Sequence, residues 1–308
     1  MSKLGVVALI AAAAIGACKQ KDAPPAGSAA ASAPLDAASA PSAPPDAAPA
    51  PEPATPTTVP PPPPGDGLAI PYVPPAARQI IDVTDEITIS GSATVSGREM
   101  TMLDDRAMAW KETLVAVKGD VVTQLAVSFS AATAKVARQG KAGEHPLPVA
   151  DKTYVFTLDH GQVTAVTADG GAVPPVELAE LNAFRDDLGK PDKLAALIAS
   201  KRWTKGQPVI LSADEVGAVA PPDRGMSTQQ VTMTLVAIAP KTATFALDAI
   251  YTGTLGTFTT TVTTRGSVVI DRARARPIAL EVTGDIHGTG KAEFTGRLIR
   301  KKTLGYRE

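Results

Sequence analysis

The chain has 308 residues, a formal net charge of −1, 4% aromatic residues and one cysteine. The first 79 residues hold four basic and five acidic side chains, so the remainder is formally neutral. This balance excludes the strongly basic surface on which nucleic-acid binding depends, and a lone cysteine excludes an internal disulfide, a zinc–thiolate site and a cysteine nucleophile in the folded part.

The N-terminus has the parts of a secretion signal. Lys3 supplies a positive charge, Leu4–Ala14 form an apolar run, and small residues follow. The apolar run of about eleven residues is too short to span a bilayer, which needs about 20. These features predict a signal peptide over residues 1–17.

The apolar run ends in Ile15-Gly16-Ala17-Cys18. This motif resembles the lipobox of bacterial lipoproteins, in which a signal peptidase cuts before the cysteine. The resemblance implies that Cys18 carries lipid, palmitate included, and that several acyl chains hold the protein stably on a membrane. The alternative is an ordinary signal peptide cut after an Ala-x-Ala site. Lys19, where an aspartate would favour the inner membrane, indicates the outer membrane of the cell envelope.

The next segment is built from Ala, Pro and Ser, with the run Pro60–Pro64 near its end. Frequent proline blocks helix formation, and the segment has too little apolar surface to offset its chain entropy. We predict a lipidated Cys18 followed by a disordered or polyproline II tether over residues 18–78. Fifty extended residues of this kind reach roughly 150 Å. A single β-rich domain is expected over residues 79–308.

Alternation of apolar and polar residues predicts the first strands of this domain. They are expected over residues 87–96, 100–110, 121–136, 154–158 and 163–167. Gly119-Asp120 and Gly161 lie where hairpin turns are needed.

The pattern changes to a helical period in the middle of the chain. Leu178, Leu181, Phe184 and Leu188 are spaced by three or four residues, which places them on one stripe of a helix. Gly189 follows at the position of a C-terminal cap. A second helix is expected from Pro191 to about Lys201. Our hypothesis is that both helices pack on the concave side of the sheet as a plug or lid.

Further strands are predicted over residues 208–212, 231–237, 245–249, 253–265, 268–270, 278–282 and 292–298. Asp271–Pro277 is interpreted as a connection between two of them. Neighbouring strands without alternating helices favour antiparallel pairing. The predicted fold is therefore α+β and mainly β, a curved antiparallel sheet (half-barrel or barrel-like) with two helices inserted mid-chain.

Three histidines limit the chemistry available to this domain: His145, His160 and His287. Asp285 and His287 are two apart, so on a strand they share one face, as a metal site would need. The sequence places no third metal ligand at a suitable spacing from Asp285 and His287. It also lacks the Gly-x-Ser-x-Gly elbow that would indicate a serine nucleophile. We predict no catalytic, cofactor or metal site.

Charged residues gather in three places. Asp186, Asp187 and Asp192 surround a helix break, where helix-end solvation explains them better than a calcium loop. Arg272, Arg274 and Arg276 alternate and would share a face in an extended chain. Basic residues also crowd the C-terminus, at Arg297, Arg300, Lys301, Lys302 and Arg307. Either basic group could contact lipid phosphates, lipopolysaccharide or peptidoglycan carboxylates, or it could keep sheet edges from pairing.

These observations favour a non-catalytic binding or structural module of the envelope, presented on a long tether. Its expected partners are the membrane, through the N-terminal lipid, and an apolar ligand or an envelope protein held by the sheet. Nucleic acid is not an expected partner. The alternative is a hydrolase that acts on cell-wall or lipid substrates.

Overall fold

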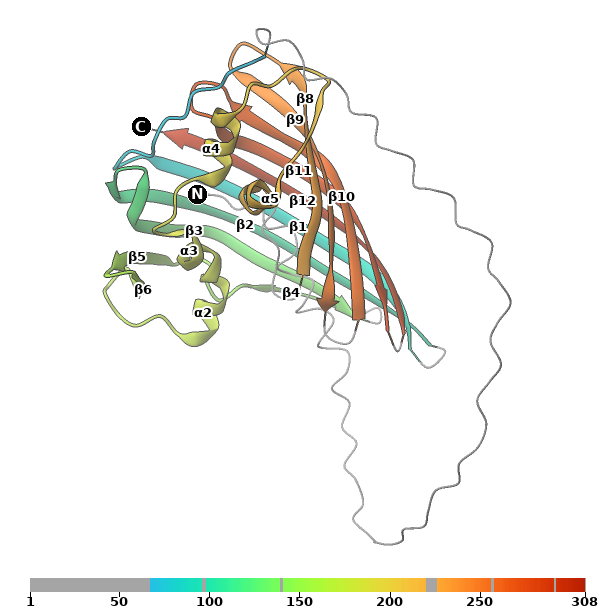
Figure 1. Cartoon of the computed structure of the whole chain (residues 1–308). Helices are drawn as coiled ribbons and strands as arrows, with labels where there is room; N and C mark the ends of the chain where they lie inside the picture. Colours follow the sequence, from blue (N-terminus) through green and yellow to red (C-terminus); the bar gives the residue numbers. More distant parts are fainter. Residues whose placement is uncertain are drawn as a thin grey trace, which may run out of the picture. The chain divides into compact units, whose positions relative to one another are not determined.

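In the part of the chain that the computed structural model describes, twelve strands form one curved, open, antiparallel sheet (Figure 1). The structure describes residues 67–95, 98–138, 141–219, 226–255, 258–290 and 292–307. The strand order is β6-β5-β3-β2-β1-β12-β11-β10-β9-β8-β7, and β4 lies beside β3. The predicted fold class is confirmed.

The strands are long at the centre of the sheet and short at its edges. In the first half of the chain they are β1 (Ile80–Val95), β2 (Arg98–Lys118), β3 (Val121–Arg138), β4 (Lys141–Pro146), β5 (Thr153–Asp159) and β6 (Gln162–Thr167). In the second half they are β7 (Pro208–Ile210), β8 (Met226–Ile238), β9 (Thr242–Leu255), β10 (Phe258–Asp271), β11 (Arg276–Thr289) and β12 (Glu293–Arg307).

Hairpin turns join β2 to β3 and β5 to β6, as expected. Gly119 and Gly161 have φ values of 65° and 81°, which a residue without Cβ adopts freely. His160, just before Gly161, also has a positive φ, of 46°.

The first predicted helix is two short helices. They are α2 (Pro175–Glu180) and α3 (Asn182–Asp187), which meet at Leu181. Gly189 follows with φ 81°, as a C-terminal cap glycine should, and its N–H donates to the carbonyl oxygen of Val122 at 3.0 Å. This bond ties the end of α3 to β3.

The second predicted helix is α4 (Lys193–Ser200). Asp192 caps it, because its Oδ1 accepts a hydrogen bond from the backbone N–H of Ala195 at 3.1 Å. A further helix, α5 (Ala213–Val219), was not predicted. None of the helices in the described part of the chain combines the length and apolarity that crossing a membrane requires.

The predicted break between strands at residues 266–267 is wrong. Gly266 lies inside β10, which runs unbroken from Phe258 to Asp271 beside β9. A Cβ at Gly266 would collide with the carbonyl oxygen of Glu281 on β11. The glycine therefore permits a close backbone approach within the sheet.

The segment before β1 packs on the folded unit, although the sequence assigned residues 67–78 to the tether. Leu68 and Trp203 exchange backbone hydrogen bonds of 2.8 and 2.9 Å. Ile70 is buried in the core, and the carbonyl oxygen of Val73 accepts from Arg276 Nη2 at 3.1 Å. The folded unit thus includes Gly67. The predicted signal peptide, Cys18 and the tether up to residue 66 lie outside the described residues.

The helices lie on the concave side of the sheet (Figure 1), and their apolar residues form two cores with it. The α4–α5 core joins these helices to the inner face of β8–β12, through residues that include Leu194, Ile198, Val216, Met233, Phe245, Ile270 and Leu298. The α3 core joins the two residues that flank α3, Leu181 and Leu188, to β2, β3 and β5, through residues that include Trp110, Leu125, Phe129 and Phe156.

Phe184 of α3 shows how closely the helices fit. Its ring lies 5.8 Å from Trp110 and 6.0 Å from Phe129, both edge to face, and stacks on Phe156 at 5.9 Å. Such pairs stabilise beyond their area burial. The helices act here as part of the core.

Candidate functional site

Strand alternation sorts the polar residues of the central strands onto two faces. On β1 the odd-numbered residues from Ile81 to Ile89 are buried toward the helices, and even-numbered residues such as Thr84 and Ser90 face outward. Two polar groups result. We call them the inner network (Asp85, Trp110, Glu112, Arg300 and Lys302) and the outer hollow (Ser90, Ser92, Asp285, His287, Thr295 and Arg297).

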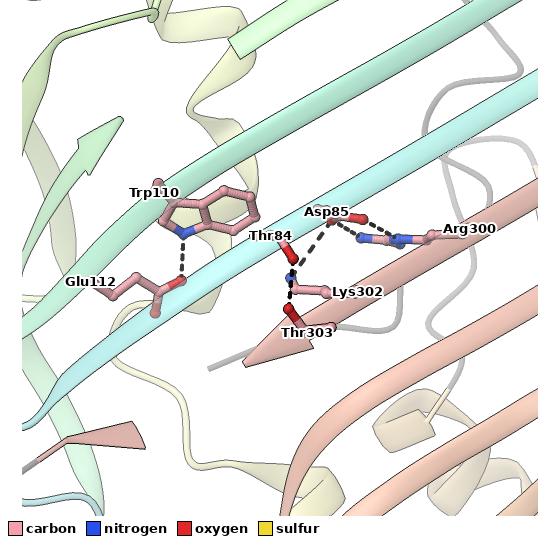
Figure 2. A network of polar contacts seen from close by, with 7 residues as sticks. All are labelled: Thr84, Asp85, Trp110, Glu112, Arg300, Lys302 and Thr303. Atoms are coloured by element: carbon pink, nitrogen blue, oxygen red, sulfur yellow. Dashed lines mark hydrogen bonds and ion pairs between the residues drawn. The ribbon is translucent and has the colours of Figure 1, made fainter. Parts of the chain in front are cut away.

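The inner network is organised around Asp85, which is 2% exposed (Figure 2). Arg300 donates from Nε to Oδ1 at 2.9 Å and from Nη2 to Oδ2 at 2.6 Å. Lys302 Nζ lies 3.8 Å from Oδ2. The two hydrogen bonds of Arg300 form the bidentate arrangement that makes guanidinium–carboxylate pairs strong.

Trp110 and Glu112 continue the network on β2 (Figure 2). The indole Nε1 donates to Glu112 Oε1 at 2.9 Å, and Lys302 Nζ lies 5.1 Å from the centroid of the Trp110 ring. Burial lowers the pKa of Lys302, and the charge of Asp85 opposes that shift. The network therefore holds its carboxylates against cations and an indole, which suits a structural role.

A buried carboxylate outside the inner network, Glu177 of α2, fastens the helix to β5. It accepts hydrogen bonds from Lys152 Nζ at 2.7 Å and from the Tyr154 hydroxyl at 2.6 Å. The bonds from Lys152 and Tyr154 lower the pKa of Glu177, and burial together with the Glu177 contact raises the pKa of Tyr154.

The outer hollow is a shallow depression of about 460 Å³ on the opposite face of the sheet. Two cross-strand rows line it. Ser90, Arg297 and Asp285 form one row across β1, β12 and β11, because Ser90 pairs with Arg297 and Arg297 with Asp285.

The second row lies two residues further along each strand. Ser92 pairs with Thr295, and Thr295 pairs with His287. Gly91 and Gly296 pair with each other between the two rows. On the inner face the Phe294 ring covers both glycines, since a Cβ on Gly91 or Gly296 would come within 2.7 or 3.1 Å of Phe294 Cζ.

The three histidines lie on different elements. His145 is on exposed β4. His160 is 93% exposed at the β5–β6 turn, where its Nδ1 lies 2.7 Å from Asp159 Oδ1. Only His287 lines the hollow. Asp285 and His287 share a face, as predicted, but no group of three or more His, Cys, Asp or Glu side chains suited to a metal occurs among the described residues.

Arg272, Arg274 and Arg276 do not share a face, because residues 272–275 form a turn. Arg272 Nη1 donates to the carbonyl oxygen of Ala239 at 2.7 Å. Arg276 is buried and donates from Nη1 to Gln79 Oε1 at 2.5 Å. The second of these contacts holds the segment before β1, so these arginines connect elements of the fold.

The C-terminal basic residues do not form one patch either. Arg300 and Lys302 point to the inner face and are buried, whereas Arg297, Lys301 and Arg307 point outward. Strand alternation separates residues that the sequence places together.

Sequence reasoning missed the inner network. Asp85 and Glu112 stand at positions where the alternation of β1 and β2 demands apolar residues, between Val83 and Ile87 and between Trp110 and Leu114. A charge in the buried register was the available signal, since such a charge needs a partner.

No family model matches the chain, and no curated protein matches it. Among solved structures, the chain is similar to an outer membrane channel from Pseudomonas putida F1, at 6% identity and a TM-score of 0.24. The alignment covers 77% of this chain and 98% of the channel. It is also similar to DynF from the dynemicin biosynthesis pathway of Micromonospora chersina, at 9% identity, a TM-score of 0.19, and coverage of 77% and 88%.

Proposed function

We propose that the protein is a lipid-anchored component of the bacterial cell envelope, held on the outer membrane by Cys18. Its sheet domain is a non-catalytic binding module presented on the Pro/Ala tether. The observation that carries the binding role is the outer hollow, where six polar side chains from three adjacent strands line one depression.

The inner face is occupied by the protein's own side chains, which favours binding outside. In the α4–α5 core, Ile198, Leu235 and Phe245 are fully buried, and in the α3 core so are Phe156 and Leu181. An apolar ligand on the concave side would have to displace these contacts. We therefore place the partner, an envelope component, on the outer face.

The anchor is supported by the motif Ile15-Gly16-Ala17-Cys18 behind its apolar run, and by the Pro-rich segment that follows. A bacterial host expressing the full chain should incorporate a palmitate analogue and place the protein in the outer-membrane fraction. Cys18→Ser should abolish labelling and leave an uncleaved or released form. Unchanged labelling and fractionation in that variant would exclude the anchor.

Lys19→Asp serves as the matched variant, because it leaves the lipid site intact. It should retain labelling and move the protein toward the inner membrane. A separate experiment tests the proposal that the domain is non-catalytic: the full chain is incubated with peptidoglycan and with phospholipid, and released products are measured. Product release that depends on Asp285 or His287 would contradict that proposal.

A further inference from the structure

We infer that the outer hollow binds a neutral, linear glycan. The inference rests on the proposed function, because it names the class of partner for that same surface. Its six polar lining residues supply the hydrogen-bonding groups, and the second of the two rows continues beyond the hollow.

The lining side chains stand at regular spacing. Strands are about 4.8 Å apart and alternate residues about 6.8 Å apart along a strand, so two rows of three cover about 9.6 by 6.8 Å. All six side chains belong to the outward register of β1, β12 and β11. The hollow thus presents a regular grid of polar groups wide enough for sugar rings lying on their faces.

The platform under this grid is closely packed. The inner-face neighbours of the lining residues include Ile89, Ile286 and Leu298, all 0% exposed in the core. The ring of Phe294 covers the paired Gly91 and Gly296 from the same side. Side chains that stand on well-packed strands are positioned before a ligand arrives, which reduces the entropic cost of binding.

The hollow contains both hydrogen-bond donors and hydrogen-bond acceptors. Asp285 only accepts hydrogen bonds when ionised, Arg297 only donates, and the hydroxyls of Ser90, Ser92 and Thr295 do both. A sugar hydroxyl also donates and accepts, so neighbouring hydroxyls on one ring can be satisfied by this combination.

The charges of the hollow argue against an anionic ligand. The carboxylate of Asp285 stands directly opposite Arg297 in the register of β11 and β12. One negative and one positive group offset each other, so the hollow lacks the single-sign field that concentrates phosphates or cations. A neutral polyhydroxylated molecule is the class that fits.

The second row continues across the sheet in hydroxyl-bearing residues, which points to an extended ligand. His287 pairs with Thr261 on β10, and Thr261 pairs with Thr252 on β9. With Ser92 and Thr295, the row crosses five strands, or roughly 19 Å at the usual strand spacing. A linear oligosaccharide can follow such a row across the strands.

The test is calorimetric titration of the purified full chain with N-acetylchitotetraose, with maltotetraose and with inorganic phosphate. We expect the chitotetraose to bind. Arg297→Ala and Asp285→Asn should each weaken binding about tenfold or more, as loss of a charged hydrogen bond does. Lys301→Ala and Glu281→Gln are the matched controls, because they change exposed charges on the same two strands, outside the hollow, and should leave binding unchanged.

Binding of chitotetraose alone would identify the ligand as an amino-sugar glycan of the cell-wall type. Binding of both sugars would show that the hollow accepts a broader range of neutral glycans. Both results support the inference. Absence of sugar binding, or binding of phosphate alone in a manner that depends on Arg297, would overturn it. These titrations do not involve the anchor, so they separate failure of the glycan site from failure of the envelope assignment, which Cys18→Ser tests.

Discussion

Arg300 binds Asp85 through two hydrogen bonds, of 2.9 and 2.6 Å, although the two residues are 215 positions apart. The pair joins β12 to β1, and so joins the end of the chain to the first strand of the sheet. Both side chains are buried. Lys302 places a second buried cation near the same carboxylate, at 3.8 Å, so Asp85 faces two buried cations.

Asp85→Asn should destabilise the protein by about 3–5 kcal/mol, because it removes the buried carboxylate that Arg300 binds through two hydrogen bonds. The measurement is the free energy of unfolding in urea at neutral pH. Asp82→Asn is the control, since Asp82 on the same strand pairs with Arg307 at the exposed rim. It should cost no more than about 1 kcal/mol. An equal loss of unfolding free energy in the two variants would show that the buried Asp85–Arg300 pair stabilises the protein no more than the exposed Asp82–Arg307 pair.

Phe184→Ala should lower the free energy of unfolding by about 3 kcal/mol, the low end of the range for phenylalanine, because the side chain is half-buried. It removes the aromatic contacts to Trp110, Phe129 and Phe156. Uptake of an apolar dye should not change. Val176→Ala, at a 62% exposed position on α2, should have almost no effect. A stable Phe184 variant that takes up dye would mean that α3 is a lid.

Stability should decrease in acid through Glu177. Its pKa in the folded protein lies below the ordinary value of 4.5, chiefly because Lys152 and Tyr154 bind the carboxylate. The unfolded chain therefore takes up this proton first, so the stabilisation is present above pH 4.5 and is lost as the pH falls through the folded-state pKa. Urea unfolding between pH 7 and pH 3 measures the slope.

Glu177→Gln should make that slope shallower, whereas Glu144→Gln on exposed β4 should leave it unchanged. Parallel slopes for the wild type and the Glu177 variant would assign the acid sensitivity to other carboxylates.

Gly91→Ala should destabilise the protein by about 1–3 kcal/mol, as overpacking does. The new methyl group would come within 2.6 Å of the Thr295 carbonyl oxygen, which belongs to the neighbouring strand and cannot turn aside as a flexible side chain does. Gly143→Ala on β4 is the control, because nothing lies within 4 Å of its Cβ position. Thermal unfolding should show a lower midpoint for the first variant alone.

The sequence by itself determined features that depend on near neighbours in the chain. Alternation identified most strands, the helical period identified α4 and the region of α2 and α3, and glycines marked the turns at Gly119 and Gly161. Gly189 was recognised as a helix cap for the same reason, since a positive φ is a local requirement. The motif ending in Cys18 is also local, and it remains a prediction.

Only the tertiary structure decided which residues meet across the sheet. Register places Ser90 of β1 beside Arg297 of β12, about 200 residues further along the chain, and places Arg297 beside Asp285 of the preceding strand β11. Register also places Arg300 and Lys302 on the buried face and their neighbour Lys301 on the solvent-exposed face. The basic residues that cluster in the sequence therefore do not form one surface patch. The physical reason is that pairing partners are selected by burial of a whole face, and no local pattern in one strand records which strand will lie beside it.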